Sequence, residues 1–105
     1  MAWVVLLLAA LFETGWAVGI KYTDGFTRFW PTVATLASMA ASVWLLSISV
    51  RALPLGTAYA VWTGIGTVGT VVLGVVLFGE PLDAVRILAL AMVVVGIGLL
   101  RLSYA

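Results

Sequence analysis

A long apolar stretch near the start of the chain, interrupted by a single charge, constrains the fold more than any other feature. Residues 3–20 read WVVLLLAALFETGWAVGI, and among them only Glu13 and Thr14 are neither apolar nor small. At about 1.5 Å of rise per helical residue, this stretch comes close to the roughly 30 Å hydrocarbon core of a bilayer. The sequence therefore predicts a membrane-spanning helix that carries a carboxylate inside it.

Three further apolar runs are long enough to span a bilayer, and nearly all charged residues lie between the runs. Hydrophobic residues make up 65% of the chain and charged residues only 9%, whereas a soluble domain carries about 25% charged residues. We therefore predict an all-α membrane protein with a single domain over residues 1–105. Its four transmembrane helices are expected at about 2–20, 32–50, 55–78 and 84–102, and Pro31 suits the first turn of the second one.

The composition argues against several other classes of protein. The chain contains no Cys and no His, which excludes disulfides and metal sites built on thiolate or imidazole ligands, and a net charge of +1 gives no reason to expect nucleic acid. We expect no enzymatic activity and no cofactor, with protons as the only coupling ion. The N-terminus lacks a basic segment and its apolar run contains an acid, which argues against a cleaved signal peptide.

Glu13 is the first candidate functional residue. An ionised carboxylate inside a bilayer costs several kcal/mol, so such residues usually face a bundle interior or a water-filled cavity. We interpret Glu13 as a site for a proton or a cation. The structural alternative is an ion pair with a buried Lys or Arg, but no Lys or Arg falls in the interior of any of the four runs, since Arg86 and Arg101 lie near the ends of the fourth. A proton-conducting assembly subunit remains a different functional class that also explains a membrane carboxylate.

Aromatic and hydroxyl residues are candidates for the surroundings of this acid. Trp16 lies one helical turn after Glu13, while Tyr59 and Trp62 share a face of the third run. Such rings stack on flat cations, and their N–H or O–H groups can donate hydrogen bonds to a carboxylate. Ser42, near the middle of the second run, can orient a carboxylate. The alternatives are that the rings only pack between helices and that the serine bonds its own backbone.

Glycines mark places where helices can approach closely. Gly15 and Gly19 form a GxxxG spacing in the first run. Gly64, Gly66 and Gly69 match the dinucleotide fingerprint GxGxxG, but that fingerprint requires a preceding strand and a βαβ unit. Because the match lies inside an apolar span, we do not interpret it as a nucleotide site.

The basic residues are almost evenly divided between the two sides of the membrane. Lys21, Arg28 and Arg86 fall on one side, and Arg51 and Arg101 fall on the other together with the N-terminal amine. Since a bias of Lys and Arg in short loops sets orientation, this near balance leaves two alternatives. Either another feature sets the orientation, or the chain inserts both ways, which would allow an antiparallel homodimer.

Taken together, these residues resemble the small multidrug resistance transporters over essentially the whole chain. The resemblance rests on Glu13, on the loop Lys21-Tyr-Thr-Asp-Gly25-Phe-Thr-Arg28, on Gly56-Thr-Ala-Tyr59-Ala-Val-Trp62-Thr-Gly64-Ile-Gly66, and on Gly79-Glu80-Pro81-Leu82. The segment Glu13-Thr-Gly-Trp16-Ala-Val-Gly-Ile-Lys21-Tyr22 is similar to the guanidinium-exporter branch, which places Trp three residues after the acid. The polyaromatic-drug branch typically has Gly there, and has a Tyr in the second helix where this chain has Met39.

This resemblance implies a fold, a function and a set of site residues. It implies an antiparallel, dual-topology homodimer of four-helix subunits in the prokaryotic plasma (inner) membrane, in membrane lipid and without nucleic-acid partners. Glu13 matches the acid that binds protons and substrate, and Trp16, Ser42, Tyr59 and Trp62 match positions that line the substrate site. The implied activity is proton-coupled antiport that exports guanidinium and small substituted guanidinium cations. The alternative within the family is a proton-coupled exporter of quaternary ammonium compounds and other drugs.

Overall fold

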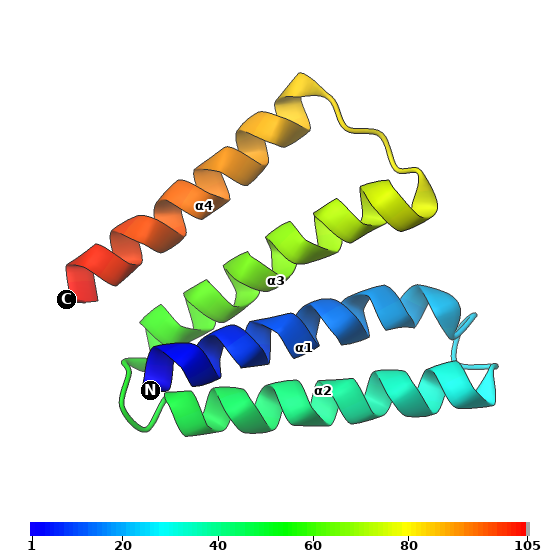
Figure 1. The fold of residues 1–105 in the computed structure, drawn as a ribbon, viewed down its shortest axis with the longest axis horizontal. Helices are drawn as coiled ribbons and strands as arrows, with labels where there is room; N and C mark the ends of the chain where they lie inside the picture. Colours follow the sequence, from blue (N-terminus) through cyan, green and yellow to red (C-terminus); the bar gives the residue numbers. More distant parts are fainter. Residues whose placement is uncertain (105) are drawn as a thin grey trace.

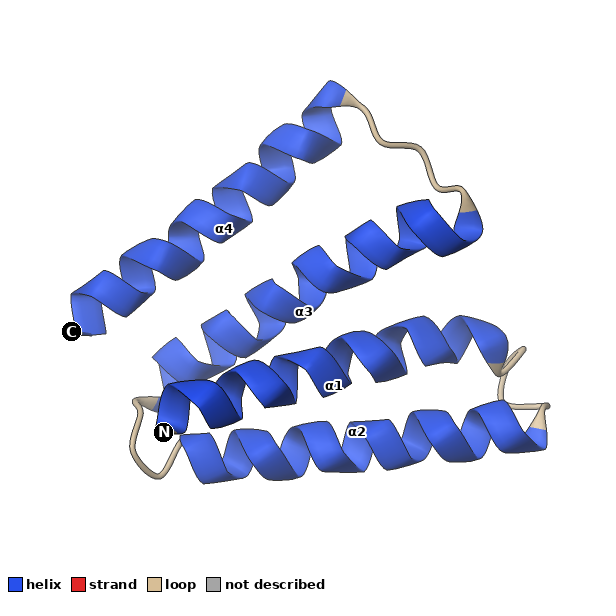
Figure 2. Ribbon diagram, viewed as in Figure 1, coloured by secondary structure: helices blue, strands red, loops and turns tan. Residues whose placement is uncertain are grey.

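The computed structural model describes residues 1–104, which form four helices joined by short loops (Figures 1 and 2). These helices are α1 (Ala2–Tyr22), α2 (Phe29–Ser49), α3 (Leu55–Phe78) and α4 (Ala84–Tyr104). All four are long and apolar enough to cross a membrane. The prediction of an all-α protein with four membrane-spanning helices is thus confirmed at the level of the single chain.

Two helix ends illustrate how local sequence sets the boundaries. The second helix begins at Phe29, three residues before the predicted start, and Pro31 lies in its first turn. Proline is tolerated there because the first backbone N–H groups of a helix have no intrahelical partner. The third helix ends at Phe78 and is capped by Gly79, which adopts a left-handed conformation with φ of 65°. Glycine takes this conformation without the penalty that a side chain would add.

The helices pack unevenly. The first helix lies closely against both α2 and α3, whereas α4 packs mainly against α3 (Figure 1). No residue from 84 to 103 is buried. The small core instead combines one face of α1 and one face of α3 with a leucine of the α2–α3 loop, and its buried hydrophobic residues are Leu6, Ala9, Ala10, Leu53, Ala58, Val61 and Trp62. Most of the large apolar side chains therefore remain on the outside, where a bilayer or a second subunit can cover them.

The GxxxG pair of α1 faces α2, which confirms that small residues mark a close approach of these helices. A Cβ atom added to Gly15 would lie 3.0 Å from the Oγ of Ser38, and one added to Gly19 would collide with Thr35. Ser38 also donates a hydrogen bond of 2.9 Å to the backbone carbonyl of Phe12. Hydroxyl groups on α2 therefore fix the segment of α1 on which Glu13 lies.

The GxGxxG match lies within α3, and its glycines face neighbouring helices. A Cβ atom on Gly64 would lie 2.8 Å from the side chain of Ile97 in α4, and one on Gly69 would press against Thr14 of α1. Gly66 receives the acid of α1, as described below. These glycines thus serve helix packing, in agreement with the interpretation that they do not bind a nucleotide.

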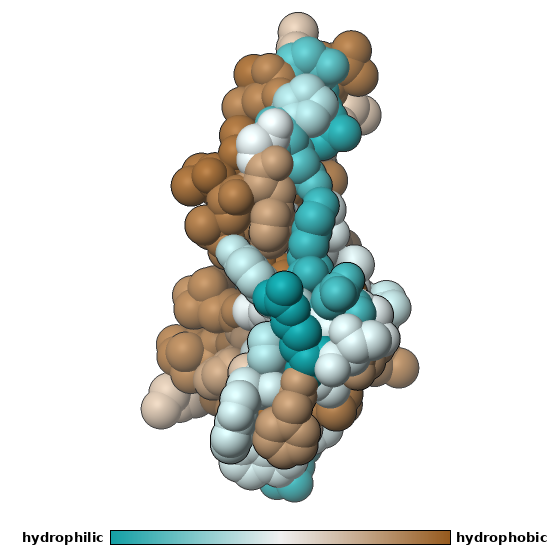
Figure 3. Space-filling model, turned by 90° about the vertical axis from the view of Figure 1, so that its right-hand side faces the viewer, coloured by the Kyte–Doolittle hydropathy of each residue, from teal (hydrophilic) through white to brown (hydrophobic). Residues whose placement is uncertain are grey.

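The two ends of the bundle differ in what they carry. Both termini lie at one end, together with the α2–α3 loop (Figure 1). The other two loops form the opposite end, where hydrophilic residues gather beside a hydrophobic flank (Figure 3). At that end, Lys21 places its Nζ 4.9 Å from the ring centroid of Phe78. At the end with the termini, the Arg101 guanidinium lies 4.7 Å from the ring centroid of Trp3. Both cations lie in the last turn of a helix, where a bilayer interface is expected.

Candidate functional site

Glu13 lies in the middle of α1 and directs its carboxylate at α3. A Cβ atom on Gly66 would overlap the Oε1, Cδ and Cγ atoms of Glu13, so the missing side chain of this glycine provides the space that the acid occupies. Glu13 is half-buried as a residue, while its Oε1 atom is fully buried and has no hydrogen-bond partner within residues 1–104. In the described part of the chain, this oxygen is therefore not paired with a Lys or Arg.

A cavity of about 260 Å³ opens beside this carboxylate, between α1 and α3. Its lining residues are Glu13, Trp16 and Ala17 of α1 and Gly66, Thr67, Thr70 and Val71 of α3. The indole Nε1 of Trp16 is also buried without a hydrogen-bond partner among the described residues. Buried polar groups in proteins are nearly always hydrogen-bonded, so two lining residues that each carry a buried polar atom without a partner make this cavity the candidate binding site. Its size suits a small planar cation.

Trp62 and Ser42 form a second polar group behind this cavity. The Nε1 of Trp62 donates a hydrogen bond of 3.0 Å to the Oγ of Ser42, and Ser42 donates one of 2.7 Å to the carbonyl of Ala9. Trp62 is only 9% exposed and Ser42 is fully buried. This corrects two geometric expectations for the single chain: the indole N–H is used by a serine rather than by the carboxylate, and the serine bonds neither the carboxylate nor its own backbone. The reason is that both side chains point into the small α1–α2–α3 core.

Tyr59 extends this second group towards the outside. Its ring centroid lies 5.7 Å from that of Trp62, with the ring planes tilted by 49°, and the tyrosine is 56% exposed. The five predicted residues thus form two groups in one chain, Glu13 with Trp16 and Ser42 with Tyr59 and Trp62. They meet at α1, because Ala9, which accepts the bond from Ser42, lies one turn before Glu13.

Four cavity residues on α3 were not among the predicted site residues: Gly66, Thr67, Thr70 and Val71. The hydroxyl of Thr67 donates a hydrogen bond of 2.7 Å to the carbonyl of Thr63. The sequence held a signal for the threonines, because spacings of four, four and three residues place Tyr59, Thr63, Thr67 and Thr70 on one helical face. No comparable signal singles out one glycine of α3 as the partner of the acid.

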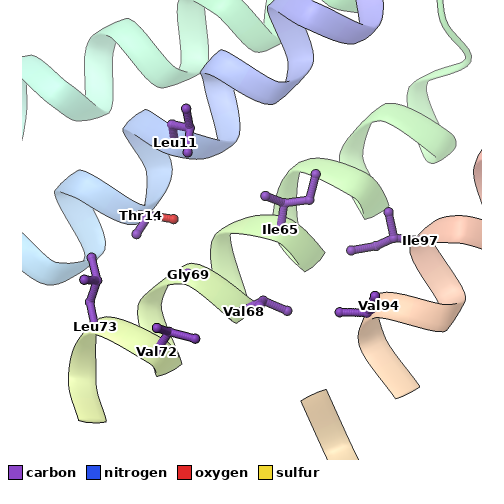
Figure 4. A pocket seen from close by; sticks show the side chains of 9 residues that line it. All are labelled: Leu11, Thr14, Ile65, Val68, Gly69, Val72, Leu73, Val94 and Ile97. Carbon is purple, nitrogen blue, oxygen red and sulfur yellow. The ribbon is translucent and has the colours of Figure 1, made fainter. Parts of the chain in front are cut away.

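A larger cavity, of about 500 Å³, lies between α1, α3 and α4 (Figure 4). It is lined by Leu11, Thr14, Ile65, Val68, Gly69, Val72, Leu73, Val94 and Ile97. The only side-chain oxygen among these residues is that of Thr14, which donates a hydrogen bond to the carbonyl of Ala10 at 3.2 Å. A cavity without a charged side chain offers nothing to compensate the charge of a cation, so the candidate site is the smaller cavity at Glu13.

Residues 1–93 match the family model described as Small Multidrug Resistance protein. The chain belongs to the small multidrug resistance family. The resemblance noted in the sequence is therefore confirmed at the level of the family.

Several relatives within the small multidrug resistance family carry the name of one branch of that family. Proteins named "Guanidinium exporter" from Yersinia pseudotuberculosis and Citrobacter freundii are 53% and 52% identical to the chain over 103 residues. A protein of the same name from Proteus vulgaris is 50% identical. Each match covers 98% of this chain and 98% or 99% of the relative. With four candidate spans and relatives from Gram-negative bacteria, the chain is a multi-pass protein of the inner membrane.

The hydrogen bond between Trp62 and Ser42 predicts how one substitution changes the stability of the protein. The substitution Trp62→Phe keeps most of the ring but removes the donor, which leaves the buried Ser42 with one hydrogen bond fewer. We expect the free energy of unfolding to fall by about 1 kcal/mol, measured by helix loss in mixed detergent micelles. Trp44→Phe is the matched control, because Trp44 is 65% exposed. Equal unfolding midpoints for both variants would contradict the structural role of the bond.

Proposed function

We propose that this chain exports guanidinium and small substituted guanidinium cations in exchange for protons. The observation that carries the proposal is the Glu13 carboxylate in a cavity of about 260 Å³ within the membrane-spanning region. A carboxylate accepts two parallel N–H bonds from a planar guanidinium group, a geometry that a point-like ammonium does not match. The names of the relatives at 50% to 53% identity support the same substrate.

Exchange follows from a single acid that serves two ligands. The buried Oε1 of Glu13 has no partner in the described chain, so either a proton or a cation can compensate the charge of the carboxylate. A cation binds when the proton leaves, and a proton displaces the cation on the other side of the membrane. Trp16 contributes an aromatic face beside the acid, which attracts a flat cation by cation–π interaction.

We further propose that the working unit is an antiparallel homodimer. In the single chain, the Glu13 cavity has walls only from α1 and α3, and Tyr59 is 56% exposed. No residue from 84 to 103 is buried, which leaves α4 with a large apolar surface. A second copy would close the cavity and bring its own Tyr59 and Trp62 towards the acid. The nearly even division of Lys and Arg between the two sides supports opposite orientations of the two copies.

Electrical recordings on purified proteoliposomes test the transport proposal. On a solid-supported membrane, pulses of guanidinium should give currents whose sign and size depend on the proton gradient. Tetraalkylammonium pulses distinguish the quaternary-ammonium alternative, because those ions carry no N–H donors and should give little or no current. Guanidinium-independent proton currents would instead favour a proton-conducting subunit.

Orientation provides a separate prediction. Because the chain contains no cysteine, a single cysteine appended to the C-terminus can be labelled from either side of the membrane. We expect about equal labelling from both sides, since neither end has a clear excess of basic residues. Inserting two lysines between Arg51 and Ala52 should shift the population strongly towards one orientation. A single orientation for the unmodified chain would rule out the antiparallel homodimer.

A further inference from the structure

Two threonines of α3 lie in the Glu13 cavity without a role in the mechanism described so far. Thr67 and Thr70 both line the cavity, although hydroxyl groups in a membrane helix usually turn back to their own backbone. Thr67 does so, by donating to Thr63. Thr70 does not: within residues 1–104 its hydroxyl makes no hydrogen bond. The carbonyl of Gly66, which Thr70 would ordinarily reach, is approached instead by the Oγ1 of Thr14 at 3.5 Å.

The chemistry of the cavity gives these hydroxyls a use. A guanidinium ion has an NH₂ group at each corner of a triangle and therefore offers donors in every direction of its plane, with no acceptor. Glu13 can accept from one edge of the triangle, and the indole N–H of Trp16 is itself a donor. Among the side chains that line the cavity, only Thr67 and Thr70 offer further acceptors, since a hydroxyl oxygen keeps lone pairs even after donating its hydrogen.

We propose that Thr70, assisted by Thr67, is a specificity-determining residue that accepts N–H groups of the cation held by Glu13. This inference rests on the proposed export of guanidinium and identifies what selects it. A quaternary ammonium ion has no N–H group, so the hydroxyls give it no hydrogen bond. Stacking on Trp16, in contrast, favours any flat or apolar cation. The threonines therefore separate the two cation classes in a way that the acid and the aromatic ring do not.

The test compares variants of similar shape in proteoliposomes on a solid-supported membrane. Thr70→Val keeps the branched shape and removes the oxygen, whereas Thr70→Ser keeps the oxygen. We expect Thr70→Val to raise the half-saturating guanidinium concentration about tenfold, as loss of a hydrogen bond to a charged group implies, and Thr70→Ser to stay within about twofold of the unmodified protein. Thr57→Val is the control, because Thr57 lies on the same helix and does not line this cavity.

A second readout separates cation binding from an effect on the acid. The pH dependence of tryptophan fluorescence without guanidinium reports protonation of Glu13 beside Trp16, and Thr70→Val should leave it unchanged. A change in this titration, or equal loss in Thr70→Val and Thr70→Ser, would overturn the proposal. So would guanidinium saturation in Thr70→Val within about twofold of the unmodified protein. If Thr70→Val does not assemble, Thr70→Ala serves as the oxygen-free variant, with the same expected loss and the same contradicting result. Absence of guanidinium current in the unmodified protein would instead refute the proposed function itself.

Discussion

Replacing Glu13 by Gln should abolish proton-coupled guanidinium exchange while leaving the protein assembled. Glutamine keeps the size of the side chain and fits the same space beside Gly66, but it neither titrates nor carries a negative charge. Loss of one partner of a buried, hydrogen-bonded charge pair costs about 2 kcal/mol or more, which corresponds to a weakening of cation binding by about thirtyfold or more. Currents driven by a proton gradient should vanish altogether, because no exchangeable proton remains at the site.

Size-exclusion chromatography in detergent should show the same elution volume for Glu13→Gln and the unmodified protein. Glu80→Gln is the matched control, because Glu80 lies beyond the end of α3 and does not line the Glu13 cavity. Robust guanidinium-for-proton exchange by Glu13→Gln would refute the assignment of Glu13 as the shared site for proton and cation.

Adding a single methyl group at Gly66 should have the second largest effect. In Gly66→Ala the new Cβ atom would occupy the space of the Glu13 carboxylate, so the acid must leave its position or the helices must separate. Overpacking of this kind typically costs about 1–3 kcal/mol. The acid also lies in the cavity that holds the proposed substrate, so we expect guanidinium currents to fall by more than about tenfold.

The control for this variant is Gly56→Ala, in the first turn of the same helix. A Cβ atom on Gly56 would meet no atom within 4 Å, Gly56 does not line the Glu13 cavity, and alanine favours a helix over glycine by up to about 1 kcal/mol. Gly56→Ala should therefore transport normally and be at least as stable as the unmodified protein. Equal currents for the two variants would contradict the idea that Gly66 provides the space for the acid. The stability of Gly66→Ala, measured by helix unfolding, distinguishes the two explanations. A loss of stability indicates that the helices have separated, whereas unchanged stability indicates that only the acid has been displaced.

The hydrophobic pattern was informative about the fold for a physical reason. In hydrocarbon, every backbone N–H and C=O group must find a partner within the protein, so long apolar segments become helices. Four such segments and the loops between them could be read directly from the chain. The ends of the segments were less certain, because a residue such as Phe29 suits either a helix or an interface, and Pro31 is compatible with a start on either side of it.

The site was predicted only in part. The acid could be identified because a charge in an apolar run is costly wherever the helix points, and Trp16 followed from its distance of one turn. The partners of Trp62 and the lining residues of the cavity depend instead on how α1, α2 and α3 are rotated about their axes. Periodicity gives the face of a helix, but it does not say which neighbour that face meets. For this reason the Trp62–Ser42 bond and the cavity threonines appear only in the structure.

By itself, the sequence determined that this protein is a bundle of four membrane helices with one acid among apolar residues. It did so because the hydrophobic effect and backbone hydrogen bonding act on each segment separately. The tertiary structure decided that Gly66 makes room for Glu13 and that Ser42, rather than the acid, takes the N–H of Trp62. It also decided that Thr70 faces the cavity with an unused hydroxyl. These features join residues from different helices, and only close packing of those helices fixes which side chains meet.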